Sequence, residues 1–476
     1  MSDPLVLGID QGSHASRALV CDRRGRLLAQ ASRNIATSYP HPDWVEQDGE
    51  EVLASVAEAM DAAVRALGAR AGDVRAAGLA IQRSSNVCWD RESGAPLSPV
   101  ISWQDRRTAA ELEPLAAQGE DIRRRSGLFL TAHYGASKLR WCLDNLPAVT
   151  RAHERGRLCW GPLASFLLFR LLRERPHVVD PQCASRTQLW NLETRAWDPE
   201  LIALFGVPAD VLPACVPTRH AFGTLQRGGI AIPVTAVNGD ATAGLFAFGW
   251  PDADAAYVTV GTSGSVSRPL ERPPPYAPRE LAGIALEDEE RVLYMLEGTI
   301  NGAGAGLDWL AGHLGMDTVL PQLPGWLAHP EAPLLFLNGV SGLASPFWLA
   351  HFEPRFIGDG APWQKAAGVV ESIVFLAQAN LEELAQAIAP PRRIRIGGGV
   401  SRLDGLCQRL AALTGLPVLR RDDPEGTARG IAYLAAGLPP EWQGAGQEEG
   451  FMPAEIPGLR ERYRRWRDEM RRLTGY

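Results

Sequence analysis

The stretch Ala236-Val-Asn-Gly-Asp240-Ala-Thr-Ala-Gly-Leu-Phe-Ala-Phe-Gly249 lies near the middle of a chain of 476 residues. The apolar run at 232–237 predicts a short buried strand, and the small residues after Asp240 predict a tightly packed helix. We therefore expect Asp240 where a strand ends and a helix begins. Its carboxylate can cap the helix by accepting hydrogen bonds from the first free N–H groups. The alternative is a chemical role, which depends on the rest of the chain.

The composition is that of a soluble globular protein, with 46% hydrophobic and 22% charged residues. A chain of 476 residues exceeds one ordinary core, so two or three domains are expected. The net charge of −7 argues against broad nucleic-acid binding, because such binding needs a positive surface field.

The sequence contains neither a secretory signal pattern nor an apolar run approaching about 18 residues, so we expect a cytoplasmic protein. Its seven cysteines are odd in number and form no Cys-x-x-Cys. This favours reduced structural thiols over a disulfide framework or a zinc site. The nine histidines also lack metal-ligand spacing with cysteine or glutamate.

The chain opens with a predicted antiparallel meander of three strands, at 5–9, 17–21 and 27–35. Its first turn carries Gly12 and Ser13, with Asp10 before the turn and Ser16 after it. Small residues let backbone N–H groups approach a phosphate, and an adjacent carboxylate can hold Mg²⁺. An ordinary hairpin turn is the alternative.

Two further apolar strands end in polar residues. The strand at 77–81 leads into Gln82-Arg83, and the strand at 99–103 leads into Trp103-Gln-Asp-Arg-Arg107. Ligands bind at the carboxyl ends of strands in α/β sheets. Arg83 can bind a hydroxyl group and Trp103 can form an apolar wall. The alternatives are a surface ion pair for Arg83 and core packing for Trp103.

A second hairpin repeats the design of the first, with a strand at 256–260, the turn Gly261-Thr-Ser-Gly264 and a returning strand. Glycine clusters at 302–306 and 397–399 add two further turns at which backbone can lie against a charged ligand. Together these features favour two versions of one domain with a nucleotide between them; the alternative is two unrelated hairpins. The tail at 459–472 is predicted to be a charged helix, and its alternating signs indicate a solvated face.

The combined motifs resemble the FGGY carbohydrate kinases, and among them the glycerol kinases most closely. The resemblance runs in order from about residue 5 to residue 440. It is carried by Gly8-Ile-Asp-Gln-Gly-Ser13, Arg17, Gln82-Arg83, Trp103-Gln104, Arg106-Arg107-Thr108, Ala184-Ser-Arg-Thr187, Gly239-Asp240, Gly261-Thr262 and Gly342-Leu-Ala-Ser-Pro-Phe-Trp348.

The resemblance implies an α/β fold of two actin-like ATPase domains, related to ribonuclease H, with a central cleft. Residues 1–237 would form the N-terminal domain, with the sugar or polyol site and the first phosphate hairpin. Residues 238–440 would form the nucleotide-binding C-terminal domain, and 441–476 a tail with the charged helix. The implied partners are ATP, Mg²⁺ and a small polyol or sugar, with no nucleic acid or membrane; a homodimer is left open.

The resemblance also implies roles for single residues. Asp240 would be the base that receives the proton of the attacking hydroxyl, and Asp10 and Asp240 would lie at the metal. The first phosphate turn would comprise Gly12, Ser13, His14 and Arg17. The nucleotide would be surrounded by Gly261, Thr262, Gly304, Asp308, Gly398 and Gly399. The acceptor would be bound by Arg83, Ser84, Trp103, His133, Asp240 and Ala241.

Three acceptor positions depart from the pattern of glycerol kinases, which have Glu, Tyr and Gln where this chain has Ser84, His133 and Ala241. Losing Glu and Gln removes hydroxyl-binding groups and opens volume, which predicts a polyol or ketose larger than glycerol. His14 also stands where the family usually has Thr.

Three other functions compete with this one. Phosphorylation of glycerol itself is the alternative within the family. The rival classes are an ATPase that acts as a chaperone or filament and a non-catalytic protein that binds sugar or nucleotide. Keeping both Asp10 and Asp240 favours catalysis.

Overall fold

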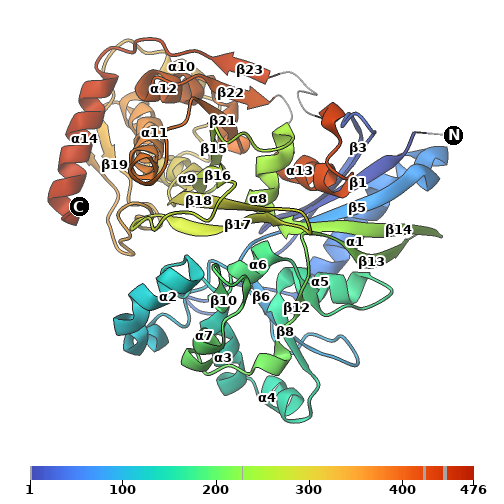
Figure 1. The fold of residues 1–476 in the computed structure, drawn as a ribbon. Helices are drawn as coiled ribbons and strands as arrows, with labels where there is room; N and C mark the ends of the chain where they lie inside the picture. Colours follow the sequence, from blue (N-terminus) through green and yellow to red (C-terminus); the bar gives the residue numbers. More distant parts are fainter. Residues whose placement is uncertain (1–2, 228, 422–424, 443–447) are drawn as a thin grey trace. The chain divides into compact units, whose positions relative to one another are not determined.

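The computed structural model describes residues 3–227, 229–421, 425–442 and 448–476. The chain folds into two compact units (Figure 1). Unit 1 comprises Met1–Pro251, Gly283–Tyr294 and Glu425–Ala445, and unit 2 comprises Asp252–Ala282, Met295–Pro424 and Gly446–Tyr476. Both units are discontinuous in sequence. The division at residues 237 and 238 stays a prediction for the family domains.

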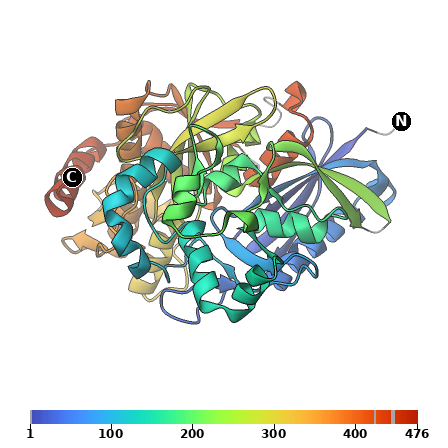
Figure 2. The ribbon, with the colours of Figure 1, turned by 60° about the horizontal axis from the view of Figure 1, so that its bottom comes forward.

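Unit 1 is built on a six-stranded mixed sheet, whose blue and green strands lie side by side in Figure 2. The expected opening meander is confirmed, because β1, β2 and β3 pair antiparallel in order. The strand order is β13 (Arg219–Arg227), β14 (Ile230–Gly239), β5 (Val74–Ile81), β1 (Leu5–Gln11), β2 (Ala15–Cys21) and β3 (Leu27–Asn34).

Strand β5 runs parallel to both of its neighbours, β1 and β14. Its last residue, Ile81, pairs with Gln11 on one side and with Gly239 on the other. The three strands therefore end level with one another. Whatever residues follow these ends must emerge at one edge of the sheet.

Helices α1 (Gly49–Arg65) and α13 (Gly426–Ala435) cover this sheet. Leu7 and Ile9 of β1 belong to the same apolar cluster as Val56 of α1. Because successive side chains alternate along a strand, Gly8 points to the opposite face. There a Cβ added at Gly8 would strike the backbone of Ala428, so α13 lies directly against β1.

A smaller four-stranded sheet in unit 1 leads into the loop that contains Trp103. Its order is β4 (Glu46–Gln47), β7 (Val100–Ile101), β6 (Asn86–Asp90) and β8 (Leu158–Pro162). The short strands β9 (Val178–Val179) and β12 (Ala214–Cys215) pair with each other, as do β10 (Trp190–Asn191) and β11 (Ala196–Trp197). Further α-helices of unit 1 are α2 (Gly119–Ser126), α3 (Gly135–Asn145), α4 (Pro147–Glu154), α5 (Leu163–Leu171), α6 (Pro181–Ser185), α7 (Pro199–Leu204) and, directly after β14 of the large sheet, α8 (Asp240–Ala243).

A seven-stranded sheet forms the centre of unit 2, although residues 283–294 of β17 and β18 count with unit 1. The expected second hairpin is confirmed, because β15 pairs antiparallel with β16 and also parallel with β21. The order is β17 (Leu281–Glu287), β18 (Val292–Ile300), β16 (Gly264–Leu270), β15 (Ala255–Val260), β21 (Arg393–Gly397), β22 (Val418–Arg421) and β23 (Glu448–Phe451). The two-stranded sheet is β19 (Leu335–Leu337) with β20 (Arg355–Ile357), and the helices are α9 (Gly304–His313), α10 (Leu323–Leu327), α11 (Pro362–Ala387), α12 (Asp404–Thr414) and α14 (Leu459–Thr474).

The C-terminal charged helix is confirmed as α14, and beside the solvated face that its charges indicate it has a buried face. Tyr463, Trp466 and Met470 are buried in the core of unit 2. Arg462 donates two hydrogen bonds of 2.7 Å to the buried Glu371 of α11. Apolar residues at helical spacing therefore anchor this helix between its charges. None of the described helices is long and apolar enough to cross a membrane.

The close contact of α13 with the sheet predicts a steric effect at Gly78. A Cβ added there would lie 2.6 Å from the carbonyl oxygen of Ile431 and 3.1 Å from the Cβ of Ala435. We expect Gly78→Ala to lower the free energy of unfolding by about 1–3 kcal/mol. Urea denaturation followed by circular dichroism measures this. The control is Gly72→Ala, where an added Cβ meets nothing within 4 Å; equal midpoints for both variants would contradict the close packing.

The ion pair of Arg462 with Glu371 predicts a second effect on stability. Both side chains are nearly buried, with 11% and 2% exposed. Removing the arginine leaves a buried carboxylate with Arg409 beside it, at 3.5 Å. We expect Arg462→Met to cost about 3 kcal/mol of unfolding free energy.

The matched control is Arg472→Met in the same helix. Arg472 is 67% exposed in its pair with Glu469, and we expect its loss to cost less than about 1 kcal/mol. Denaturant unfolding of the two variants measures the difference, and similar costs would refute a structural role for the tail helix.

Candidate functional site

The carboxyl ends of β1, β5 and β14 carry the first group of expected site residues. Asp10 is the second-last residue of β1, Gln82 and Arg83 follow β5, and Asp240 follows β14. Because these strands end level, the residues meet at one edge of the sheet in unit 1. The expectation that Asp240 lies between a strand and a helix is confirmed, since β14 ends at Gly239 and α8 begins at Asp240.

Asp240 is not the N-cap residue of α8, although its carboxylate accepts a hydrogen bond within the first turn of the helix, as the cap interpretation expects. Gly239 holds the cap position of α8, without a side-chain capping bond, and Asp240 is the first helical residue. The Oδ1 atom of Asp240 accepts a hydrogen bond from the N–H of the next residue, Ala241, at 2.7 Å. A Cβ added at Gly239 would lie 2.6 Å from Cγ of Arg83. The glycine before Asp240 therefore leaves room for the arginine stem.

The electrostatics of this edge centre on Asp10, which is 6% exposed. The pKa of Asp10 is raised to about 7, with burial as the largest cause; the charges of Asp240 and Glu425 also raise it, and Arg17 lowers it. The Nη1 atom of Arg17 lies 3.4 Å from Oδ2 of Asp10, and its Nε lies 3.7 Å from Oε2 of Glu425. A buried carboxylate next to like charges is stabilised by a cation, so this edge suits a metal ion.

The two carboxylates expected to bind a cation at this edge are those of Asp10 and Asp240. In the described part of the chain, no cluster of three or more His, Cys, Asp and Glu side chains could hold a metal ion. A Mg²⁺ ion at Asp10 and Asp240 would need further ligands from water and phosphate, which is the usual mode for Mg²⁺ in phosphoryl-transfer sites.

The turn between β1 and β2 contains the residues expected at the phosphates. It is closed by a hydrogen bond of 3.0 Å from the N–H of Gly12 to the carbonyl of Ala15. Ser13 is half-buried, whereas the side chain of His14 is exposed. Ser16, the residue after this turn, has a fully buried side chain whose hydroxyl lies 2.8 Å from the hydroxyl of Ser55 on α1. It therefore holds the helix to the sheet.

The expected acceptor residues Ser84, Trp103 and His133 also lie in unit 1. Ser84 has a positive φ of 64°, and its buried hydroxyl has no hydrogen-bond partner among the described residues. The ring centroids of Trp103 and His133 are 5.6 Å apart. Burial lowers the pKa of His133 well below its usual range, and Arg106 and three other cations lower it further. The imidazole is therefore neutral at neutral pH.

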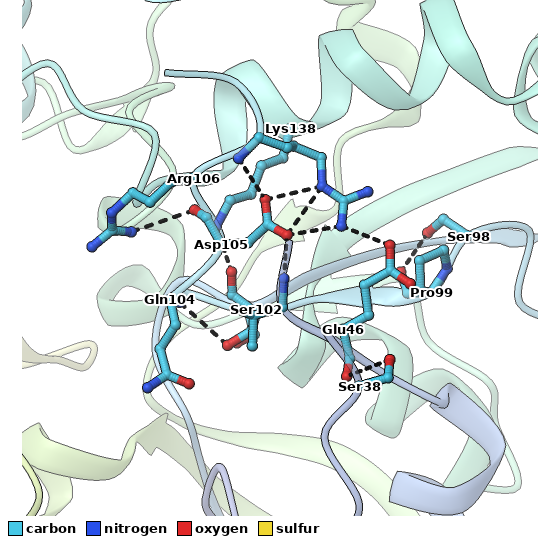
Figure 3. Close-up of polar contacts among 12 residues, drawn as sticks. Ser38, Glu46, Ser98, Pro99, Ser102, Gln104, Asp105, Arg106 and Lys138 are labelled. Atoms are coloured by element: carbon cyan, nitrogen blue, oxygen red, sulfur yellow. Dashed lines mark hydrogen bonds and ion pairs between the residues drawn. The ribbon is translucent and has the colours of Figure 1, made fainter. Parts of the chain in front are cut away.

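A polar network fixes the loops that carry Trp103 and His133, and Figure 3 shows its part around Lys138 and Asp105. The buried Lys138 donates a 2.6 Å hydrogen bond to the carbonyl oxygen of Ser102 and a 2.9 Å hydrogen bond to that of His133. Asp105 accepts hydrogen bonds from the N–H of Val45, at 2.7 Å, and from the Arg107 guanidinium.

Arg107 ties this network to the rest of the small sheet. Its Nη2 atom also donates to Glu46 at 2.6 Å. Its Cζ atom lies 4.0 Å above the ring of Trp44 and 4.5 Å from that of Trp141. The charged group is thus neutralised by carboxylates on its edge and stacked on aromatic rings on its faces.

Sequence reasoning missed Lys138, although one signal was present. Lys138 is one of only two lysines in the chain, in which Lys and Arg together number 48. A flexible ammonium can donate to carbonyl oxygens in different directions, which the planar guanidinium cannot do equally well. A lysine in such an arginine-rich chain therefore indicates a position that suits an ammonium better than a guanidinium.

The residues expected around the nucleotide lie in unit 2, and most of them are brought together. The N–H of Gly304 donates to the carbonyl of Gly261 at 2.8 Å, and the N–H of Ala305 donates to that of Thr262 at 3.0 Å. These bonds hold the start of α9 on the turn of the second hairpin. A Cβ added at Gly304 would lie 2.7 Å from the carbonyl oxygen of Gly261, so the approach requires glycine.

The third glycine cluster meets the same hairpin. Gly398 has a φ of 91°, and an added Cβ would lie 2.7 Å from the carbonyl carbon of Val260. Gly399 is exposed next to it. Asp308 lies one turn along α9 with an exposed side chain. Backbone N–H groups at such turns, and the N-terminus of α9, can bind phosphate.

Two family models match this chain, one in each half of the sequence. The family model described as the N-terminal domain of the FGGY family of carbohydrate kinases matches residues 5–247. The corresponding C-terminal model matches residues 256–437. A glycerol kinase of Symbiobacterium thermophilum is 33% identical over 509 residues, covering 100% of this chain and 99% of the relative. A glycerol kinase of Geobacter sp. is 36% identical over 446 residues, covering 90% and 89%.

Solved structures share the fold at lower identity. The chain matches a glycerol kinase of Plasmodium falciparum in complex with ADP with a TM-score of 0.89 at 21% identity, over 99% of this chain and 98% of the other. It matches a xylulose kinase of Rhodospirillum rubrum with a TM-score of 0.86 at 22% identity, over 99% of both chains. The resemblance and fold inferred from the sequence are thereby confirmed. The chain belongs to the FGGY family of carbohydrate kinases and is an ATP-dependent kinase.

Proposed function

We propose that this kinase phosphorylates a hydroxyl group of a polyol or sugar larger than glycerol, with Asp240 as the base. The observation that carries the proposal is the level ending of β1, β5 and β14, which gathers Asp10, Arg83 and Asp240 at one edge. We expect the reaction to take place in the cytoplasm.

Phosphoryl transfer demands alignment of the reacting groups and stabilisation of charge. Bound Mg²⁺ at Asp10 and Asp240 would neutralise charge on the phosphates. Asp240 would orient the acceptor hydroxyl and take its proton late, because a carboxylate with a usual pKa of about 3.9 cannot deprotonate a free alcohol. Arg17 and the N–H groups of the Gly12 turn would hold phosphate oxygens.

The preference for a larger acceptor is supported by Ser84 and Ala241, which have short side chains at positions next to Arg83 and Asp240. Glycerol-sized acceptors gain affinity from every hydroxyl that is bound, and losing such partners weakens their binding. Phosphorylation of glycerol is the second candidate, supported by the identity of 33–36% to proteins named glycerol kinases. A non-catalytic binding protein is the alternative of another class, and the retention of both Asp10 and Asp240 argues against it.

The assignment of Asp240 predicts that Asp240→Asn folds and binds nucleotide but loses phosphorylation by about 10²–10⁴-fold. The reason is that an amide cannot take the hydroxyl proton. Coupled measurement of ADP formation, with nucleotide binding and circular dichroism as folding checks, tests this. Asp210→Asn serves as the control, because that side chain is 70% exposed; turnover close to the wild type in Asp240→Asn would remove Asp240 from the mechanism.

The departures at Ser84 and Ala241 predict the substrate range. Among polyols and ketoses of about three to seven carbons, we expect larger acceptors to give higher kcat/KM than glycerol, because the altered positions contribute volume instead of hydroxyl-binding groups. The measurement is acceptor-dependent ADP formation. Ser84→Glu and Ala241→Gln, alone and together, should shift the ratio of kcat/KM towards glycerol. Glycerol as the best acceptor of the unaltered protein by a wide margin would refute the preference.

A further inference from the structure

A chain of hydrogen bonds connects the expected acceptor wall with the expected phosphate turn. The indole Nε1 of Trp103 donates to Oγ of Ser13 at 2.9 Å. The Ser13 hydroxyl in turn donates to Oε1 of Gln82 at 3.3 Å. Trp103 and Ser13 are 90 residues apart in sequence. If either Trp103 or Ser13 moves away from the other, the hydrogen bond between the indole and the hydroxyl lengthens.

Gln82 is the centre of this chain and is 2% exposed. Its Oε1 also accepts a 3.0 Å hydrogen bond from Ser85, whose hydroxyl accepts one from the backbone N–H of Trp103 at 3.1 Å. Its Nε2 donates to Oε1 of Gln47 at 2.8 Å and to Oε1 of Gln11 at 3.3 Å. Trp103 is thus tied to one amide group at two points, through Ser13 and through Ser85.

The phosphate turn is tied to the same network by its backbone. Nε2 of Gln47 donates to the carbonyl of Ser13 at 2.6 Å, and Nε2 of Gln11 donates to the carbonyl of Gly12 at 2.8 Å. All four polar atoms of the Gln47 and Gln82 amide groups are therefore engaged. A buried network in which the members are satisfied has one favoured arrangement, and breaking one bond disturbs the others.

The Ser13 hydroxyl has a single hydrogen, which sets up a competition. In this structure the hydrogen is donated to Gln82, while the oxygen accepts from the Trp103 indole. A phosphate oxygen at the turn would take the hydrogen from Gln82. Accepting from the indole makes the hydroxyl a better donor, because hydrogen bonds in series polarise one another. The position of Trp103 therefore influences how strongly Ser13 binds phosphate.

We propose that Ser13, held between Trp103 and Gln82, couples the acceptor pocket to nucleotide binding. An acceptor that packs on Trp103 would then raise nucleotide affinity, and nucleotide would raise acceptor affinity by the same factor. The proposal rests on the proposed function, which assigns Trp103 to the acceptor and Ser13 to the phosphates. Under this coupling, a change at Trp103 alters nucleotide affinity even when no acceptor is bound.

The test is a double-mutant cycle on nucleotide binding, measured by calorimetry with the full chain, Mg²⁺ and a non-hydrolysable ATP analogue. Trp103→Phe keeps an aromatic ring and removes the indole N–H, and Ser13→Ala removes the hydroxyl. We expect each to weaken binding about fivefold or more, and the double variant to bind no more weakly than Ser13→Ala. Ser13→Thr keeps the hydroxyl and should restore affinity.

Trp197→Phe is the matched control, since it removes an indole hydrogen bond of 2.9 Å to the carbonyl of Pro213 elsewhere in unit 1. Its nucleotide affinity should equal that of the wild type. Ser85→Ala gives a second test, because it cuts the link between the Trp103 N–H and Gln82 without altering the indole. Circular dichroism of every variant confirms folding.

Unchanged nucleotide affinity in folded Trp103→Phe and Ser85→Ala, or losses that add in the double variant, would overturn the coupling. These results leave the proposed function standing if acceptor-dependent ADP formation is observed. A wild-type protein that binds no nucleotide would overturn both proposals. The two failures are thus distinguished by the binding of the wild type alone.

Discussion

The parallel pairing of β5 with β1 and β14 is the constraint on which the rest of the site depends. Ile81 is level with Gln11 and with Gly239, so the three strands release their next residues at the same edge. A slip of one residue in either pairing would send every following side chain to the other face. The separation of Asp10 and Asp240 is therefore set by backbone hydrogen bonds, and with it the contribution that the charge of Asp240 makes to the raised pKa of Asp10, next to the larger effect of burial.

Close packing of α13 fixes the depth of this edge. Gly8 and Gly78 bring the helix against the sheet, and a Cβ added at Gly430 would strike the backbone of Ala243 in α8. The Thr427 hydroxyl donates to the carbonyl of Asp240 at 3.3 Å. Small residues on one helix therefore hold both the sheet and the residue proposed as the base, at a separation that larger side chains would not allow.

Local features of the structure could be predicted from the sequence, and distant contacts could not. Both hairpins and the strand-to-helix step at Asp240 follow from apolar runs and turn residues within about ten positions. The partners of Gln82 lie between 3 and 71 positions away, and Lys138 acts on a carbonyl 36 positions before it. No periodic pattern records such contacts. The helical spacing of Tyr463, Trp466 and Met470 indicates a buried face of α14, but the many charged residues between them favour a solvated face in a sequence-based interpretation.

Unit 1 combines segments from both ends of the chain, and this has a consequence during synthesis. The carbonyl of Ala428, which lies against Gly8, belongs to a residue made 420 positions later. At about 5–20 residues per second, roughly 20–80 s pass between the synthesis of Gly8 and that of the helix residue that covers it. During that time the strip along Gly8 and Gly78 lacks its cover and is open to other nascent chains and to chaperones. Gly8 and Gly78, which permit close contact with α13 in the folded protein, thus form a narrow uncovered strip until α13 has been synthesised.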